Sequence, residues 1–234
     1  MSEASDPELV PSPIPPGPVA DRAALARVGE SVRARLAADP AAYRVPVDQA
    51  EIFALADFLT AAECARFMAM IDATAQPSRV LDHGYKGVFR TSYSAEVERT
   101  DPFVRMIERR LDDLLGFDNA WGETIQGQRY APGQEFKAHN DWFHTGAPYW
   151  QGESQRGGQR SWTAMIYLND VVAGGITDFV RLGVTIPPQR GALLVWNNAR
   201  PDGMVNDMTI HAGRPVEQGV KYVITKWYRT RPWG

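Results

Sequence analysis

The chain of 234 residues carries a net charge of −3, and 44% of its residues are hydrophobic, which predicts one large domain with a substantial core. This charge gives no bulk electrostatic basis for binding nucleic acid or an acidic membrane surface, so we expect neither partner. One cysteine, Cys64, excludes an internal disulfide, and the lack of a secretory signal or of an apolar run near ~20 residues favours a cytoplasmic protein.

The first 50 residues differ in composition from the rest of the chain. Residues 1–19 hold the proline-rich run DPELVPSPIPPGP, which predicts a disordered tail. Apolar residues recur at a helical period over 20–38, which predicts a helix. With the linker that follows, we expect residues 20–50 to form an appended segment and residues 51–230 to form the main domain.

Two helices are expected in the first part of this domain. A strand is predicted over 52–59, and Thr60 followed by Glu63 gives the capping-box pattern of a helix over 60–75. An Asp-Pro dipeptide, which places proline in the first helical turn, predicts another helix over 102–117.

Short apolar runs separated by glycine, proline and Asn-Asp turns follow from Trp121 onward. They predict roughly seven or eight strands, which is typical of an antiparallel sandwich or barrel. The runs lie at residues 123–130, 135–141, 161–168, 177–182, 192–197, 208–212 and 221–229. The predicted fold class is therefore mainly β with flanking helices, an α+β protein.

Several of these strands alternate between a polar and an apolar face. In the run 123–130, Gln128 and Tyr130 share a polar face. In the run 161–168, Thr163 lies on one face and Trp162 on the opposite, apolar face. Strands with an apolar outer face and a polar inner face predict a barrel whose interior binds something polar.

The run 135–141 contains His139-x-Asp141, whose two side chains point to the same face of a strand. A third candidate, His211, lies 72 residues further along, where an antiparallel strand can return beside the first. Two histidines and one carboxylate form a facial site that suits non-haem Fe(II) and oxygen, although zinc also accepts these ligands. Taken alone, the His-x-Asp spacing fits a hydrogen-bonded polar strand end better than a metal site.

Lys221 begins the last predicted strand and shares a face with Trp227. Beside a metal it would pair with a substrate carboxylate, whereas in isolation it is an ordinary solvated strand end. The segment 142–159, which begins with Trp142, is long and lacks periodicity. Such a loop is either a lid over a site or a variable surface loop.

Together, these motifs resemble the prolyl 4-hydroxylase-like branch of the Fe(II)/2-oxoglutarate-dependent dioxygenases. The resemblance covers about residues 50–230 and is carried by four stretches in order, preceded by Arg90-Thr91-Ser92. The four stretches are Arg129-Tyr130-x-x-Gly133-Gln134-x-Phe136-x-x-His139-x-Asp141, Thr163-x-x-x-Tyr167-Leu168-Asn169, Gly174-Gly175-x-Thr177-x-Phe179, and His211-Ala212-Gly213-x-Pro215-Val216-x-x-Gly219-x-Lys221, with Trp227 after them.

The resemblance implies a double-stranded β-helix, or jelly-roll, core over about residues 122–230, with supporting helices before it. It implies hydroxylation of an aliphatic carbon by Fe(II), 2-oxoglutarate and O2, with release of succinate and CO2, and ascorbate as the reductant of the iron. No catalytic side chain beyond the metal ligands is implied. The implied iron ligands are His139, Asp141 and His211, the 2-oxoglutarate pocket holds Lys221, Tyr130 and Thr163, and the substrate-pocket candidates are Trp227, Arg90 and Trp142.

Several alternatives stay open from the sequence. The substrate is either a prolyl or other residue of a peptide or protein, or a free amino acid or small metabolite. A free carboxylate needs a counter-charge, for which the candidates are Arg90, Arg129, Arg160 and Arg181. A cupin-like metal-binding module without turnover is a further reading, but it has no need of the cation at Lys221. A zinc hydrolase needs a general base, and Glu135 on the opposite strand face is the nearest candidate. The sequence does not indicate an oligomeric state.

Overall fold

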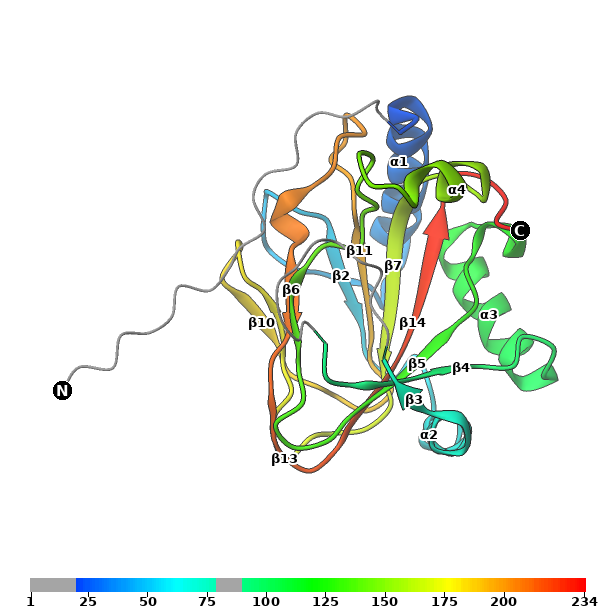
Figure 1. Ribbon diagram of the computed structural model, residues 1–234. Coiled ribbons are helices and arrows are strands. Elements are labelled where there is room, and N and C mark those ends of the chain that lie inside the picture. Colours follow the sequence, from blue (N-terminus) through cyan, green and yellow to red (C-terminus); the bar gives the residue numbers. More distant parts are fainter. Residues whose placement is uncertain (1–19, 79–89) are drawn as a thin grey trace.

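The computed structural model describes residues 20–78 and 90–234, so the proline-rich segment 1–19 lies outside the described residues. Within the described part, an eight-stranded sheet and a four-stranded sheet face each other and form the jelly-roll core (Figure 1). All the strand pairs are antiparallel. The prediction of a mainly β fold with flanking helices is confirmed.

The strands fall into three sheets. The large sheet consists, in spatial order, of β1 (Tyr43–Arg44), β2 (Ile52–Leu55), β11 (Leu193–Asn197), β7 (Arg160–Tyr167), β14 (Lys221–Arg229), β5 (Gln126–Tyr130), β4 (Tyr93–Glu96) and β3 (Gln76–Pro77). The small sheet consists of β10 (Val184–Ile186), β9 (Thr177–Phe179), β12 (His211–Gly213) and β6 (Phe136–His139). A separate pair is formed by β13 (Val216–Gln218) and β8 (Ala173–Gly174).

Three helices cover the outer face of the large sheet (Figure 1). These three are α1 (Arg22–Ala38), α2 (Ala61–Thr74) and α3 (Pro102–Leu115). The described residues also contain the short helix α4 (Trp150–Gln155) and 3₁₀ turns at η1 (Asn119–Trp121) and η2 (Asp207–Thr209). No helix in residues 20–78 and 90–234 is long and apolar enough to cross a membrane.

The ends of α2 and α3 follow from their capping residues. Thr60 accepts from the backbone of Glu63, whose side chain accepts from the backbone of Thr60, so the expected capping box is present. Asp101 caps α3 ahead of Pro102, and Gly116 ends that helix with φ 77°, a conformation that glycine adopts without steric cost. Both predicted helices are therefore confirmed.

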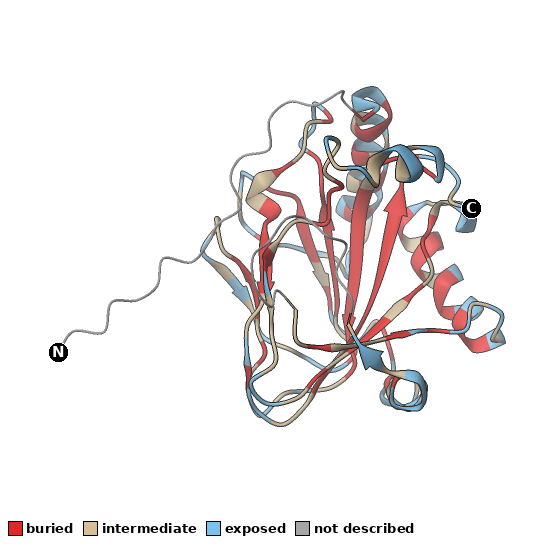
Figure 2. Ribbon diagram, viewed as in Figure 1, coloured by how far each residue is buried: buried red, intermediate tan, exposed pale blue. Residues whose placement is uncertain are grey.

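The main core lies between the helices and the outer face of the large sheet, where Figure 2 shows the central strands buried. Trp162 and Ile166 of β7 pack there with Phe67 of α2 and Leu111 of α3. The predicted apolar face of this strand is thus the face that the helices cover. Buried Cys64 belongs to the same core.

One ionic cluster is embedded in this apolar layer. The Lys226 ammonium lies 2.8 Å from a Glu108 carboxylate oxygen and 3.7 Å from Asp112, both on α3. The hydroxyl of Tyr228 donates to the same Asp112 oxygen, at 2.7 Å. Lys226 therefore has its counter-charges built into the fold.

The helix of the predicted appended segment joins the main core. Val32 and Leu36 of α1 belong to the same apolar cluster as the sheet, and Arg33 pairs with Glu51 ahead of β2. The α1 helix itself matches the helix expected over 20–38.

The structure differs from the expected elements in three places. The strand predicted over 52–59 ends at Leu55, because the chain turns through Asp57 with φ 52°. In the run 208–212, a 3₁₀ turn precedes β12, which begins only at His211. The segment 142–159 contains the helix α4 rather than a structureless loop.

Candidate metal centre

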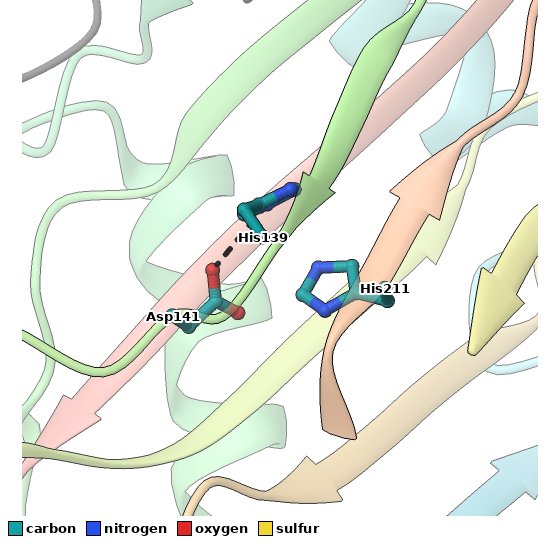
Figure 3. Close-up of side chains that lie close together, drawn as sticks. All are labelled: His139, Asp141 and His211. Atoms are coloured by element: carbon teal, nitrogen blue, oxygen red, sulfur yellow. Dashed lines mark ion pairs between the residues drawn. The ribbon is translucent and has the colours of Figure 1, made fainter. Parts of the chain in front are cut away.

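Two neighbouring strands of the small sheet bring the three candidate ligands together. His139 of β6 and His211 of β12 are directly opposite each other across the antiparallel pair. Asp141 follows two residues after His139, so its side chain returns to the same side (Figure 3). One ligand atom from each of the three residues lies within 4.8 Å of the others. The three residues that the sequence singled out therefore form one cluster.

Backbone carbonyl groups fix the protonation of both imidazoles. Nδ1 of His139 lies 2.8 Å from the carbonyl oxygen of Lys137, and Nδ1 of His211 lies 3.0 Å from that of Thr209. A carbonyl oxygen only accepts, so each Nδ1 carries a hydrogen, and Nε2 is the nitrogen that keeps the lone pair in a neutral ring. Burial, and next to it the neighbouring His211, lowers the pKa of His139 to about 3, which keeps its ring neutral.

Aromatic rings hold the two imidazoles in place. Phe136 stacks on His139 with 3.7 Å between ring centroids. Trp196 and Phe179 lie 4.8 and 5.8 Å from the His211 ring. The ring planes are thus set by packing as well as by the hydrogen bonds at Nδ1.

The Asp141 carboxylate is buried and has two different oxygens. Oδ2 lies 2.7 Å from the hydroxyl of Thr163, whereas Oδ1 lies 3.8 Å from Nε2 of His139. Burial acts most strongly on this group and by itself raises the pKa of Asp141. Electrostatic interactions with His211, His139 and Arg160 and the hydrogen bond from Thr163 outweigh it, so the pKa lies below its usual value.

This donor set fits a divalent transition metal. Two neutral imidazole nitrogens and one carboxylate oxygen converge, which is the two-histidine, one-carboxylate arrangement that leaves coordination positions open for other ligands. The hydrogen bonds from Nδ1 of both rings and to Oδ2 are the outer contacts that orient such ligands.

The candidate ligands open into a cavity between the two sheets, whose empty space is about 410 Å³ when the part open to solvent is included. Its lining is a mixture of aromatic and polar side chains from both sheets. The lining residues are Gln128, Tyr130, Phe136, His139, Asp141, Met165, Thr177, Trp196, His211, Gly213, Lys221, Val223, Thr225 and Trp227. The alternate residues of β14 from Lys221 to Trp227 all face this cavity, as their spacing predicts.

Lys221 brings a positive charge into this cavity. Its side chain is 3% exposed, and Nζ lies 5.4 Å from the ring centre of Tyr130 and 5.5 Å from that of Tyr167. No acidic side chain among the described residues forms an ion pair with it. Burial lowers the pKa of Lys221 to about 7, which is the effect expected for an ammonium group that lacks a partner. A bound carboxylate would supply that partner.

Three of the expected pocket residues take other positions. Thr163 bonds to Asp141 and is not among the residues that line the cavity. Trp142 packs in a separate apolar cluster with Leu25 and Ala199. Arg90 lies over the ring of Phe136, at 4.6 Å, and bonds to Ser92 and Gln126 beside the cavity.

Two side chains near the ligands were not singled out from the sequence. Trp196 lines the cavity, and its place on the cavity face of the run 192–197 follows from strand alternation. Asn198 donates to Thr163 from just beyond the end of β11, where no sequence pattern marks it.

Comparison with known proteins points to one group of relatives. The sequence profile of the 2OG-Fe(II) oxygenase superfamily matches residues 125–229, which include all three candidate ligands and Lys221. Prolyl 4-hydroxylase 1 of Arabidopsis thaliana is 34% identical over 201 residues, which are 77% of this chain and 69% of that protein. Prolyl 4-hydroxylase 2 of the same plant is 29% identical over 201 residues, and the chain spans 66% of its length.

A solved structure supports the same relationship. The viral collagen prolyl hydroxylase of Paramecium Bursaria Chlorella virus-1, in a 2OG complex, is 26% identical with a TM-score of 0.59. The similarity covers 76% of this chain and 94% of the viral protein.

Proposed function

Since this chain belongs to the prolyl 4-hydroxylase-like branch of the 2OG-Fe(II) oxygenase superfamily, we propose that it hydroxylates a prolyl residue within a peptide or protein. The observation that carries the proposal is one cavity that contains both the His-Asp-His cluster and an ammonium group that forms no ion pair with an acidic side chain of residues 20–78 and 90–234. The reaction consumes O2 and 2-oxoglutarate, and it releases succinate and CO2 with the hydroxylated product.

In this proposal, the residues of the small sheet bind the iron. His139 and His211 offer Nε2, because their Nδ1 hydrogens are engaged by carbonyl groups. Asp141 offers Oδ1 and keeps Oδ2 on Thr163. Bound Fe(II) supplies the activation of O2 that side chains alone do not provide.

The residues of the large sheet bind and orient 2-oxoglutarate. Lys221 pairs with its distal carboxylate, while the aromatic rings around the ammonium exclude water and strengthen that charge pair. Tyr130 lies opposite Lys221 in the β5–β14 register, so the two side chains bound the same end of the cavity. A module that only stores metal has no use for this arrangement.

The cavity lacks the group that a zinc hydrolase needs. Asp141 is the one acidic residue among the lining side chains, and one of its oxygens is already bonded to Thr163. Glu135 precedes β6 and is absent from the lining, so among the described residues no second carboxylate faces the cavity as a general base for hydrolysis.

The arginines favour a peptide over a free amino acid. Three of the four candidates for a substrate carboxylate already pair with acidic side chains, Arg129 with Asp72, Arg160 with Glu123 and Arg181 with Asp207. The fourth, Arg90, directs its guanidinium at Ser92 and Gln126. A prolyl residue inside a peptide has no free carboxylate, and it therefore needs no further cation.

The test is anaerobic loading with Fe(II), followed by addition of O2, 2-oxoglutarate and a panel of proline-containing peptides and free amino acids. We expect peptide-dependent succinate release and a mass gain of one oxygen atom on the peptide. In this assay, ascorbate as the reductant should prolong turnover. Succinate release driven only by free amino acids would overturn the peptide assignment, and no release with intact iron would overturn the hydroxylase assignment for this site.

A further inference from the structure

The Asp141 carboxylate is held by a relay of hydrogen bonds that reaches the large sheet. Thr163 Oγ1 lies 2.7 Å from Asp141 Oδ2, and Asn198 Nδ2 lies 2.9 Å from Thr163 Oγ1. A carboxylate only accepts, so the Thr163 hydroxyl donates its one hydrogen to Asp141 and accepts from Asn198. All three side chains are buried.

We propose that Thr163 and Asn198 are positioning residues that allow Asp141 to offer the metal a single oxygen, Oδ1. This inference rests on the proposed iron site. It assigns to Thr163 a role other than the co-substrate contact that the sequence suggested.

The surroundings of Thr163 protect the relay from water. In the sheet register, Thr163 of β7 lies between Trp196 of β11 and Trp227 of β14. Both tryptophans line the cavity, while Thr163 itself is fully buried beneath them. If the Thr163 hydroxyl were removed, this burial would keep water from replacing it. Oδ2 of Asp141 would then lose its hydrogen bond without compensation.

The backbone places Asn198 just as firmly. Its N–H donates to the carbonyl of Ser161 at 2.8 Å. The preceding residue, Asn197, directs its side chain the other way, where it donates to Glu51 and accepts from the backbone N–H of Ala199. Adjacent side chains of an extended segment point to opposite faces, so these contacts of Asn197 turn Asn198 toward the interior.

One oxygen rather than two matters for the number of coordination positions. His139, Asp141 and His211 would fill three coordination positions of a bound metal if Asp141 bound through one oxygen. The remaining positions would stay open for the small molecules of the reaction. A carboxylate that rotated and bound through both oxygens would take a position that one of these molecules needs.

The experiment measures the affinity of the metal-free protein for Mn2+ by calorimetry, without turnover. Thr163→Val removes the hydroxyl and keeps the branched shape, and we expect its Kd for Mn2+ to rise about 10- to 100-fold, the range typical of lost outer contacts to a metal ligand. Thr163→Ser keeps the hydroxyl and should bind nearly as wild type. Asn198→Leu should weaken binding in the same direction but less.

Ser161→Ala is the matched control. Ser161 lies on the same face of β7, is equally buried, and donates to the carbonyl of Tyr228 rather than to Asp141. Its loss should lower the free energy of unfolding and leave the Kd for Mn2+ unchanged. A Thr163→Val protein that binds Mn2+ like wild type would overturn the relay while leaving the iron site intact.

Two further outcomes also decide the question. If Thr163→Val does not fold, the pair Thr163→Ser and Asn198→Leu decides, and equal affinities in this pair would refute the relay. A wild-type protein that binds no Mn2+ would overturn the proposed metal site, and the relay with it.

Discussion

Replacing Lys221 by methionine removes the charge from the cavity and keeps a flexible side chain of similar length. In the folded protein the ammonium is buried without an acidic partner among the described residues, and burial lowers its pKa from 10.5 to about 7. We expect Lys221→Met to lose affinity for 2-oxoglutarate without losing the fold, because the ammonium stabilises the ligand and not the empty protein.

The size of the effect follows from the burial of the ammonium. A drop in pKa from 10.5 to about 7 corresponds to about 5 kcal/mol, since a tenfold change in proton affinity is about 1.4 kcal/mol. This free energy is an upper limit for the stabilisation that a bound carboxylate gives to the Lys221 ammonium. Losing one partner of a buried charge pair costs about 2–5 kcal/mol, so the Kd for 2-oxoglutarate should rise at least about 30-fold.

The matched control is Lys226→Met, the same substitution on the opposite face of the same strand. Lys226 is 1% exposed and pairs with Glu108 and Asp112, so its removal takes the nearest cation away from two buried carboxylates. Arg99, at 3.9 Å from Glu108, is the cation that remains beside them. We expect the free energy of unfolding to fall by about 3–5 kcal/mol, while the Kd for 2-oxoglutarate of the folded protein stays unchanged.

The assays are calorimetric titration of the Mn2+-loaded protein with 2-oxoglutarate under anaerobic conditions, and urea unfolding of the ligand-free protein. We expect Lys221→Met to bind 2-oxoglutarate more weakly with little change in stability, and Lys226→Met to lose stability with no change in 2-oxoglutarate binding. An unchanged Kd in Lys221→Met would refute the assignment of the distal carboxylate to Lys221. A large loss of stability in that variant would show that the ammonium has an internal role instead.

Three further outcomes follow from individual contacts. The unfolded chain binds more protons at Lys221 than the folded one between pH 7 and 10.5, so the unfolding free energy of the ligand-free wild type should rise with pH across that window, and difference measurements should find this contribution absent in Lys221→Met. Trp227→Phe keeps an aromatic ring beside Arg160, whose Cζ lies 4.0 Å from the indole centroid, but it removes the indole Nε1–H, which has no partner among the described residues. We expect the KM to rise about 2- to 10-fold for the molecule that accepts this hydrogen. Separate KM values for peptide and 2-oxoglutarate identify it, and two unchanged values would rule the contact out. Thr60→Ala removes one half of the α2 capping box and should lower the unfolding free energy by about 1 kcal/mol in urea melts, with no change in either KM.

Strand alternation made the large sheet and much of the cavity predictable from the sequence. Lys221 and Trp227 are six residues apart on one strand, so they share a face whatever the fold, and both line the cavity. The capping box of α2 and the Asp101 cap of α3 are local signals for the same reason, because each involves residues within one turn. Strands of two or three residues, such as β3 and β10, are too short to show a period.

The details that depend on contacts between distant segments could not be predicted. Strand alternation places Thr163 on the same face of β7 as the cavity residues. Its hydroxyl nevertheless donates to Asp141, which follows β6 of the small sheet. Trp142 directly follows Asp141 in sequence. It packs in an apolar cluster with residues of α1 and of the segment after β11, and it does not line the cavity. Only the packing of segments far apart in sequence decides such positions.

Two of the five buried side-chain atoms that lack a hydrogen-bond partner among the described residues belong to side chains that line the cavity. Among the described residues, the buried indole nitrogens of Trp196 and Trp227 have no hydrogen-bond partner, and both rings line the cavity with Lys221. Trp162 shows the same deficiency on the outer face of β7, so an unpaired indole alone is weak evidence. What distinguishes the inner face is that two such donors and an unpaired ammonium surround one space. Two buried indole donors without partners, and an ammonium group that forms no ion pair with an acidic side chain of the described residues, suit a bound molecule that accepts their hydrogens, and a dicarboxylate has the oxygens to do so.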